Sequence, residues 1–190
     1  MGRGDSTPAG EIKIAAVSFR YNIHDGKYAM RKTLEAIALG ALGLLFWITY
    51  AALYGPDPLP DRIPTHFGAD GQPNGWGPPS SLLLLPVIAG ALYLFIAALA
   101  LLPSLINLPV EVTEENRPRL EALSRQMIAF LKVYLACLFT WIQWFIIHAA
   151  RQGTASLSPM IVPVFLVVVF GTTGANIIAM IRVARTGSTS

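Results

Sequence analysis

The sequence predicts an all-α membrane protein, namely a bundle of four transmembrane helices with an ordered Pro/Gly-rich extracytoplasmic loop. Only 13% of the 190 residues are charged and 54% are apolar, whereas a soluble domain carries roughly 25% charged residues. Four long apolar segments could each cross a bilayer, and the basic residues concentrate in alternate flanks of these segments. One compact bundle would use most of a chain of this length, which leaves no room for a second folded domain.

Each predicted span is long enough for the hydrocarbon core of a bilayer. A core about 30 Å thick needs roughly 20 helical residues at about 1.5 Å each. The segments that meet this requirement are 34–54, 82–102, 127–149 and 160–181. Together they predict a transmembrane domain over 34–183, flanked by cytoplasmic segments 1–33 and 184–190. The segments lack the polar face at helical period that a soluble helical bundle would show.

Charged side chains are almost absent from the predicted spans. Glu35 lies at the edge of the first span, and Lys132 lies near the start of the third, where its long stem can reach the membrane surface. No Asp, Glu or Arg lies deep in a span, which argues against a proton relay or the transport of charged solutes. The single cysteine, Cys137, excludes an intramolecular disulfide and is expected to be a small core residue.

The distribution of basic residues predicts that both termini are cytoplasmic, because the cytoplasmic flanks of spans are enriched in Lys and Arg. Basic residues gather before the first span, between the second and third, and after the fourth, at Lys13, Arg20, Lys27, Arg31, Lys32, Arg117, Arg119, Arg125, Arg182 and Arg185. The two other connections contain only Arg62 and Arg151. This topology accounts for the net charge of +3, so no nucleic-acid partner is expected.

Three local patterns predict further structure. Residues 11–21 partly alternate and are rich in β-branched and aromatic side chains, which suggests a short strand or a membrane-surface strip. Thr113, followed by Glu114 to Glu121, is typical of a capped helix start, so the third helix should begin before its span. Small residues that would let helices approach closely recur at helical spacing, at Ala36, Gly40, Gly43, Gly171, Gly174 and Ala175.

The connection between the first two spans, residues 55–80, has the most distinctive composition. Its prolines fix φ and its glycines permit positive φ. Loops longer than about 12 to 15 residues without regular structure are usually functional or disordered, and Ile63, Phe67 and Trp76 provide apolar anchors against disorder. We therefore expect an ordered loop that caps the helix ends, with Phe67 and Trp76 buried.

Within this loop, the run LPDRIPTHFGADGQPNGWG resembles the signature of the domain-of-unknown-function 1648 family. The motif positions are Pro64, His66, Phe67, Gly71, Pro73 and Trp76. The resemblance extends over residues 34–103 and implies a bacterial inner-membrane protein, because the same domain forms the N-terminal half of SdpI-like immunity and signal-transducing proteins. Gly68 stands where the family commonly has Asn, and the second half lacks the Gly-Ile-Arg-Thr-Pro run of the SdpI-specific domain.

Candidate metal ligands are few. His66, Asp61 and Asp70 in the loop, and His148 at the end of the third span, carry nitrogen and oxygen atoms that bind divalent ions. His66 and Asp70 would share a face only on a helix, which the Pro/Gly-rich sequence disfavours. A histidine that is hydrogen-bonded within the loop is the simpler interpretation, and the sequence requires no cofactor. In the predicted topology, His66 and His148 lie on the same side of the membrane.

The sequence favours a non-catalytic membrane protein that acts as an interaction, sensor or accessory subunit through the loop 55–80. Its expected partners are the lipid bilayer and another membrane protein or a peptide. One alternative is a metal-dependent membrane enzyme that uses His66, although no nucleophile with its base and no phosphate-binding loop is recognisable. Another is a small-solute permease whose path is lined by Gln143, Thr172, Thr173 and Asn176. Those polar side chains equally suit hydrogen bonding between helices.

Overall fold

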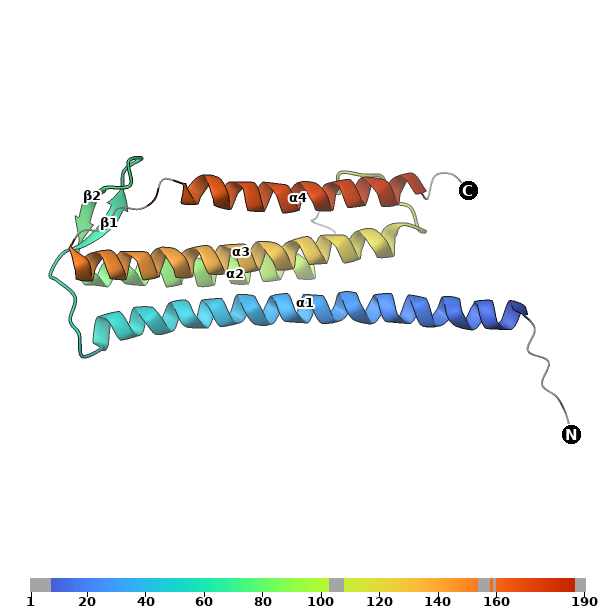
Figure 1. The fold of residues 1–190 in the computed structure, drawn as a ribbon, viewed down its shortest axis with the longest axis horizontal. Helices are drawn as coiled ribbons and strands as arrows, with labels where there is room; N and C mark the ends of the chain where they lie inside the picture. Colours follow the sequence, from blue (N-terminus) through green and yellow to red (C-terminus); the bar gives the residue numbers. More distant parts are fainter. Residues whose placement is uncertain (1–7, 103–107, 154–157, 159, 187–190) are drawn as a thin grey trace, which may run out of the picture.

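The structure, a computed structural model, describes residues 8–102, 108–153, 158 and 160–186. Four long helices lie side by side in an elongated bundle, and a small β-hairpin stands at one end (Figure 1). The elements are α1 (Pro8–Tyr54), β1 (Ile63–Phe67), β2 (Pro73–Gly77), the 3-10 helix η1 (Pro79–Leu83), α2 (Leu84–Leu101), α3 (Arg117–Gln152) and α4 (Ile161–Thr186). We call the end of the bundle at Tyr54, Pro79 and Gln152 the hairpin end.

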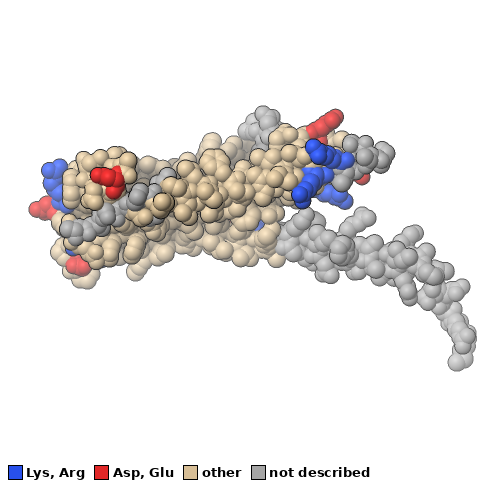
Figure 2. All heavy atoms as spheres, turned by 45° about the horizontal axis from the view of Figure 1, so that its top comes forward, with Lys and Arg blue, Asp and Glu red and all other residues tan. Residues whose placement is uncertain are grey.

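Four helical segments in the described chain are long and apolar enough to cross a membrane. They are Ala29–Tyr54, Pro79–Leu101, Arg117–Gln152 and Pro163–Arg185, with mean hydropathies between 1.7 and 2.6. On the face drawn in Figure 2, the charged side chains gather at the two ends of the molecule, and the long middle between them carries almost none. The predicted fold class, four membrane-spanning helices joined by an ordered loop, is confirmed.

The N-terminal part of α1 corrects one expectation. The helix begins at Pro8 and includes residues 11–21, so the prediction of a short strand or surface strip there was wrong. A lone strand would leave its backbone N–H and C=O groups unpaired, whereas continuing the helix satisfies them within the segment. Pro8 fits the first turn, where no intrahelical N–H is needed.

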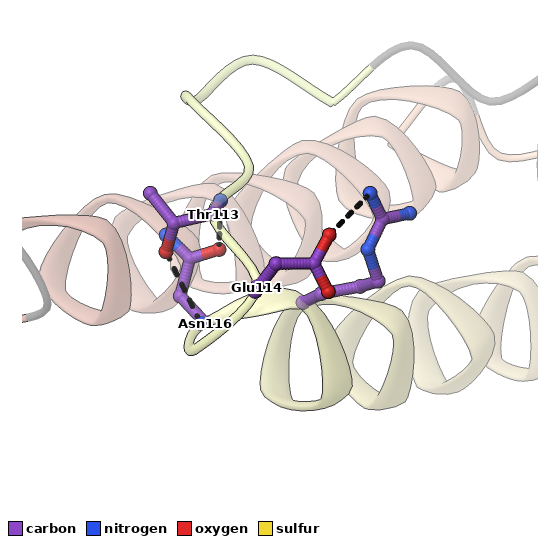
Figure 3. A network of polar contacts seen from close by, with 4 residues as sticks. Thr113, Glu114 and Asn116 are labelled. Atoms are coloured by element: carbon purple, nitrogen blue, oxygen red, sulfur yellow. Dashed lines mark hydrogen bonds and ion pairs between the residues drawn. The ribbon is translucent and has the colours of Figure 1, made fainter.

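The start of α3 corrects the predicted cap at Thr113. The N-cap is Asn116, which makes no side-chain capping bond, and Thr113 lies in a polar turn before the helix. The Thr113 hydroxyl accepts a hydrogen bond from the Asn116 N–H (3.3 Å), and the Asn116 side-chain oxygen accepts one from the Thr113 N–H (2.8 Å) (Figure 3). An exposed ion pair joins Glu114 to Arg117 at 3.9 Å (Figure 3). The helix proper begins at Arg117, after this turn and before the apolar segment, as predicted.

The central helix is α3, which packs against α1, α2, α4 and β1. At the hairpin end, the core consists of Ala52, Ile63, Leu82, Ile146, Ile147 and Ala150. The fully buried Gln143 of α3 donates to the Thr49 hydroxyl (2.8 Å) and to the Leu82 carbonyl (3.0 Å). Gln143 thus joins three elements, whereas Thr172 and Asn176 donate to carbonyls of their own helix.

Two expectations about small residues were wrong. A Cβ added to Gly40, Gly43, Gly171 or Gly174 would meet no atom within 4 Å, so these glycines mediate no close helix contact in the described chain. The buried stripe of α1 consists instead of Leu34, Ala38, Leu45, Thr49 and Ala52, at helical spacing. Cys137 is exposed on an apolar groove between α3 and α4 rather than part of the core.

Candidate functional site

The loop between the first two spans is a two-stranded antiparallel hairpin. Ile63 lies opposite Gly77, Pro64 opposite Trp76, His66 opposite Gly75, and Phe67 opposite Pro73. The register shifts on both sides of His66. Such irregularities bend a strand and redirect a side chain. The ordered loop predicted from the sequence is therefore a hairpin with His66 at its irregular point.

The turn of the hairpin explains the motif residue Gly71. The Gly68 N–H donates to the Gln72 carbonyl (2.8 Å), and the Gly71 N–H donates to the Gly68 carbonyl (2.9 Å). Gly71 has φ of 77°, in the left-handed region that favours glycine. The Asp70 carboxylate accepts the Gln72 N–H at 3.0 Å, so this candidate metal ligand has a role in the turn.

One face of the hairpin is seated on the bundle. Ile63 is 1% exposed and belongs to the core at the hairpin end. The ring of Phe67 meets the ring of Phe145 edge-on, with centroids 5.3 Å apart. Phe67 packs against this core but is only partly buried, so its predicted burial is met in part. These contacts fix β1 on α3.

The other face of the hairpin is exposed. Trp76 is 49% exposed, so the prediction that it is buried in a cap was wrong. The strand that packs on α3 is β1, and a large side chain on β2 stays outside this contact. The Arg62 guanidinium donates to the Trp76 carbonyl at 3.3 Å. A large aromatic ring is therefore held at the surface by a firmly seated hairpin.

His66 and Asn74 form a hydrogen-bonded pair on the exposed side of the hairpin, through Nδ1 of His66 and the side-chain oxygen of Asn74. A Cβ at Gly75 would lie 2.9 Å from the Cβ of His66, which explains why only glycine fits opposite this residue. His66 is thus hydrogen-bonded within the loop, and Asn74 is a neighbour that the motif analysis did not single out.

The candidate metal ligands do not form a ready metal centre. No three His, Cys, Asp or Glu side chains gather closely enough to hold an ion in the part of the chain that the structure describes. His66 is bonded to Asn74, and Asp61 is exposed. The ring of His148 stacks on Trp144, with centroids 5.1 Å apart. A metal shared by His66 and His148 therefore has no support from this geometry.

A second polar cluster, which sequence reasoning missed, lies between the helices. The Lys132 ammonium of α3 donates to one carboxylate oxygen of Glu35 in α1, and the Tyr93 hydroxyl of α2 donates to the other at 2.9 Å. The ammonium also lies 5.2 Å from the centre of the Tyr93 ring. The expectation that Lys132 reaches the membrane surface was wrong, because its side chain is 5% exposed and paired.

A signal for this cluster was present in the sequence. Glu35 and Lys132 are opposite charges near the starts of the first and third apolar segments. Figure 1 shows that α1 and α3 run in the same direction. The two residues meet in an ion pair, so they lie at similar depth. An intramembrane ionisable residue is rare and usually paired. We call Glu35, Tyr93 and Lys132 the polar triad.

Four membrane-crossing helices with a hairpin seated on one end define a small multi-pass membrane protein. The family described as "Domain of unknown function (DUF1648)" matches residues 41–90, which include the hairpin and its six motif positions. An uncharacterised protein of Archaeoglobus fulgidus is 33% identical over 156 residues, which cover 75% of this chain and 81% of that protein. No solved structure matches the chain. The chain belongs to the DUF1648 family, as the motif resemblance predicted.

Proposed function

We propose that this protein is a non-catalytic interaction subunit that binds another membrane protein or a peptide through its hairpin. The observation that carries the proposal is the 49% exposed Trp76 on a hairpin whose opposite face is seated in the core. Tryptophan is among the residues that most often dominate binding energy at interfaces. An exposed Trp on a firmly held scaffold is therefore suited to anchor a partner.

The seating of the hairpin favours binding for an energetic reason. Ile63 and Phe67 hold β1 on α3, so the hairpin does not need to become ordered when a partner arrives. Ordering a rotamer-rich interface side chain costs about 0.5 to 1.5 kcal/mol. A preformed hairpin avoids much of that cost. The paired side chains of His66 and Asn74 beside Trp76 add polar groups that can select the partner.

We further propose that the hairpin faces the extracytoplasmic side, with both termini in the cytoplasm. In support, the described chain has Arg117, Arg119 and Arg125 at the end opposite the hairpin, and Arg62 and Arg151 at the hairpin end. Cytoplasmic flanks carry the excess of basic residues in multi-pass proteins. A partner of the hairpin would then be a secreted peptide or the outer part of a neighbouring membrane protein.

Binding has more support than the two alternatives. A metal enzyme would need further ligands beside His66, but no three His, Cys, Asp or Glu side chains gather to hold an ion in the described part of the chain. A permease would need a polar path, but the groove of about 440 Å³ between α3 and α4 is lined by apolar residues such as Leu138, Trp141 and Val164. Among the described residues, no specific contact favours either alternative over the exposed hairpin.

Site-specific photocrosslinking tests the proposal in native membranes. A benzoylphenylalanine in place of Trp76 should give a discrete crosslinked protein band. The matched control is the same substitution at Trp144, an aromatic side chain of similar exposure (51%) on α3. We expect this control to crosslink to lipid alone. Absence of a protein adduct at position 76, or the same adducts at both positions, would contradict the proposal.

A second comparison tests whether the hairpin itself selects the partner. Asn74→Ala removes the acceptor of His66 without touching the seated residues Ile63 and Phe67. The crosslink at position 76 should weaken in this variant, while the thermal midpoint in detergent should hardly change. An unchanged crosslink would remove the polar pair from the proposed binding surface.

A further inference from the structure

A pocket of about 190 Å³ opens between α1 and α3 at the hairpin end, separate from the exposed face of the hairpin. Its apolar wall includes Ile48 and Ala51 of α1 and Ile147 of α3. Its polar side is formed by α3 residues one turn apart, namely Trp144, His148 and Arg151. The pocket therefore joins an apolar wall to a polar rim near the end of the bundle.

The rim of the pocket holds a pair of opposite charges. The Arg151 Nε atom lies 3.3 Å from the Asp57 carboxylate, and an Nη atom lies 3.5 Å from the Asp57 carbonyl. The side chains are 40% and 73% exposed, so both can accept a further partner. A guanidinium has five N–H donors, and Asp57 engages two of its nitrogens. Beside them, the indole of Trp144 stacks on the imidazole of His148.

The pocket lies at the level where lipid head groups are expected. Exposed aromatic side chains lie near the hairpin ends of α1 and α3, at Trp47, Tyr50, Tyr54 and Trp144. Tryptophan and tyrosine are enriched at the boundary between hydrocarbon and head groups. Ile48 lies deeper along α1 than Tyr54, and Arg151 is in the last turn of α3. The apolar wall therefore faces hydrocarbon, and the charged rim faces the head-group layer.

We infer that this pocket binds the head group of a zwitterionic phospholipid, with its phosphate on Arg151 and its amine on Asp57. Phosphate and guanidinium form strong charge-assisted hydrogen bonds. A purely anionic head group would also meet the carboxylate of Asp57, and a purely cationic one would meet Arg151, whereas a zwitterion matches both charges. The glycerol and first methylenes of the lipid would lie along Ile48, Ala51 and Ile147.

Native mass spectrometry of the delipidated full chain tests this inference. The probes are phosphatidylethanolamine, phosphatidylglycerol and diacylglycerol with identical acyl chains. Wild type should retain one phosphatidylethanolamine, several-fold less phosphatidylglycerol, and no diacylglycerol. In Arg151→Gln, the retention of phosphatidylethanolamine should be at least tenfold lower than in wild type. The matched control is Arg125→Gln, because Arg125 is also half-exposed and paired with a carboxylate, at the other end of α3.

Two variants keep the test decisive if Arg151→Gln perturbs folding. Ala51→Phe fills the pocket without removing a charge and should also abolish retention. Asp57→Asn changes an exposed side chain and should shift the preference from phosphatidylethanolamine to phosphatidylglycerol. Equal retention by wild type and Ala51→Phe, binding of diacylglycerol, or displacement of the lipid by inorganic phosphate would each overturn the inference. Equal binding of the two phospholipids by wild type would overturn the role of Asp57.

Discussion

The substitution Glu35→Gln would leave the ammonium of Lys132 without a carboxylate in a position where its side chain is 5% exposed. Removing one partner of a buried ion pair typically costs about 3 to 5 kcal/mol. We expect a loss near the lower figure, since the side chain of Glu35 is itself 34% exposed and water can reach the site. Lys132→Gln should cost less than Glu35→Gln, because the remaining carboxylate keeps its bond from Tyr93 and reaches solvent more easily.

The assay is denaturant unfolding in mild detergent, followed by helical circular dichroism. The double variant Glu35→Gln/Lys132→Gln should be clearly more stable than the sum of the single losses predicts, with a coupling of about 1 to 3 kcal/mol. A control pair is Arg125 and Glu121. Their side chains are half-exposed, and Arg125 Nη2 lies 4.0 Å from Glu121 Oε2. Glu121→Gln should change stability by less than about 1 kcal/mol. Additive losses at Glu35 and Lys132 would refute the prediction that these two side chains stabilise each other across α1 and α3.

Further predictions concern orientation, the turn and the two faces of the hairpin. In intact cells and a cysteine-free background, an impermeant thiol reagent should label Gln72→Cys and spare Thr7→Cys; the reverse pattern would invert the proposed topology. Gly71→Ala should lower the free energy of unfolding by about 1 to 2 kcal/mol, since φ is 77° at this residue. Unchanged stability would show that the turn does not need this conformation. Ile63→Ala should cost about 2 to 5 kcal/mol because it empties a buried site, whereas Trp76→Ala should stay within about 0.5 kcal/mol. If Ile63→Ala and Trp76→Ala lowered the free energy of unfolding in detergent equally, the distinction between a seated and an exposed face would be contradicted.

The spans were predictable because length and hydropathy act over many residues at once. Twenty or more apolar residues in a helix have few alternatives to a membrane. The details of packing were less accessible. No atom lies within 4 Å of a Cβ added at Gly40 or Gly171. This depends on the distance to the neighbouring helices, and the spacing of residues along one helix does not reveal that distance. The helical course of residues 11–21 was missed because β-propensity depends on a partner strand.

The hairpin was predicted as an ordered loop but not as paired strands. Its prolines and glycines are depleted in strands, so the pattern of β1 and β2 was hidden by the turn residues. The sequence singled out Phe67 and Trp76, but the partial burial of Phe67 and the exposure of Trp76 depend on which strand lies against α3. The bonding of Lys132 to Glu35 likewise depends on two helices being neighbours, which no local pattern specifies.

The central claim is that a partner covers the exposed face of the hairpin, and thiol labelling tests it directly. Gln72 is exposed directly before β2, in the same alternation as Trp76, and Ser80 is exposed beyond the hairpin. In a cysteine-free background, an impermeant maleimide should label Gln72→Cys more slowly in native membranes than in purified protein. Ser80→Cys should react equally in both. The protection at position 72 should vanish when Trp76→Ala is added. Equal labelling of Gln72→Cys in native membranes and in purified protein would contradict the account.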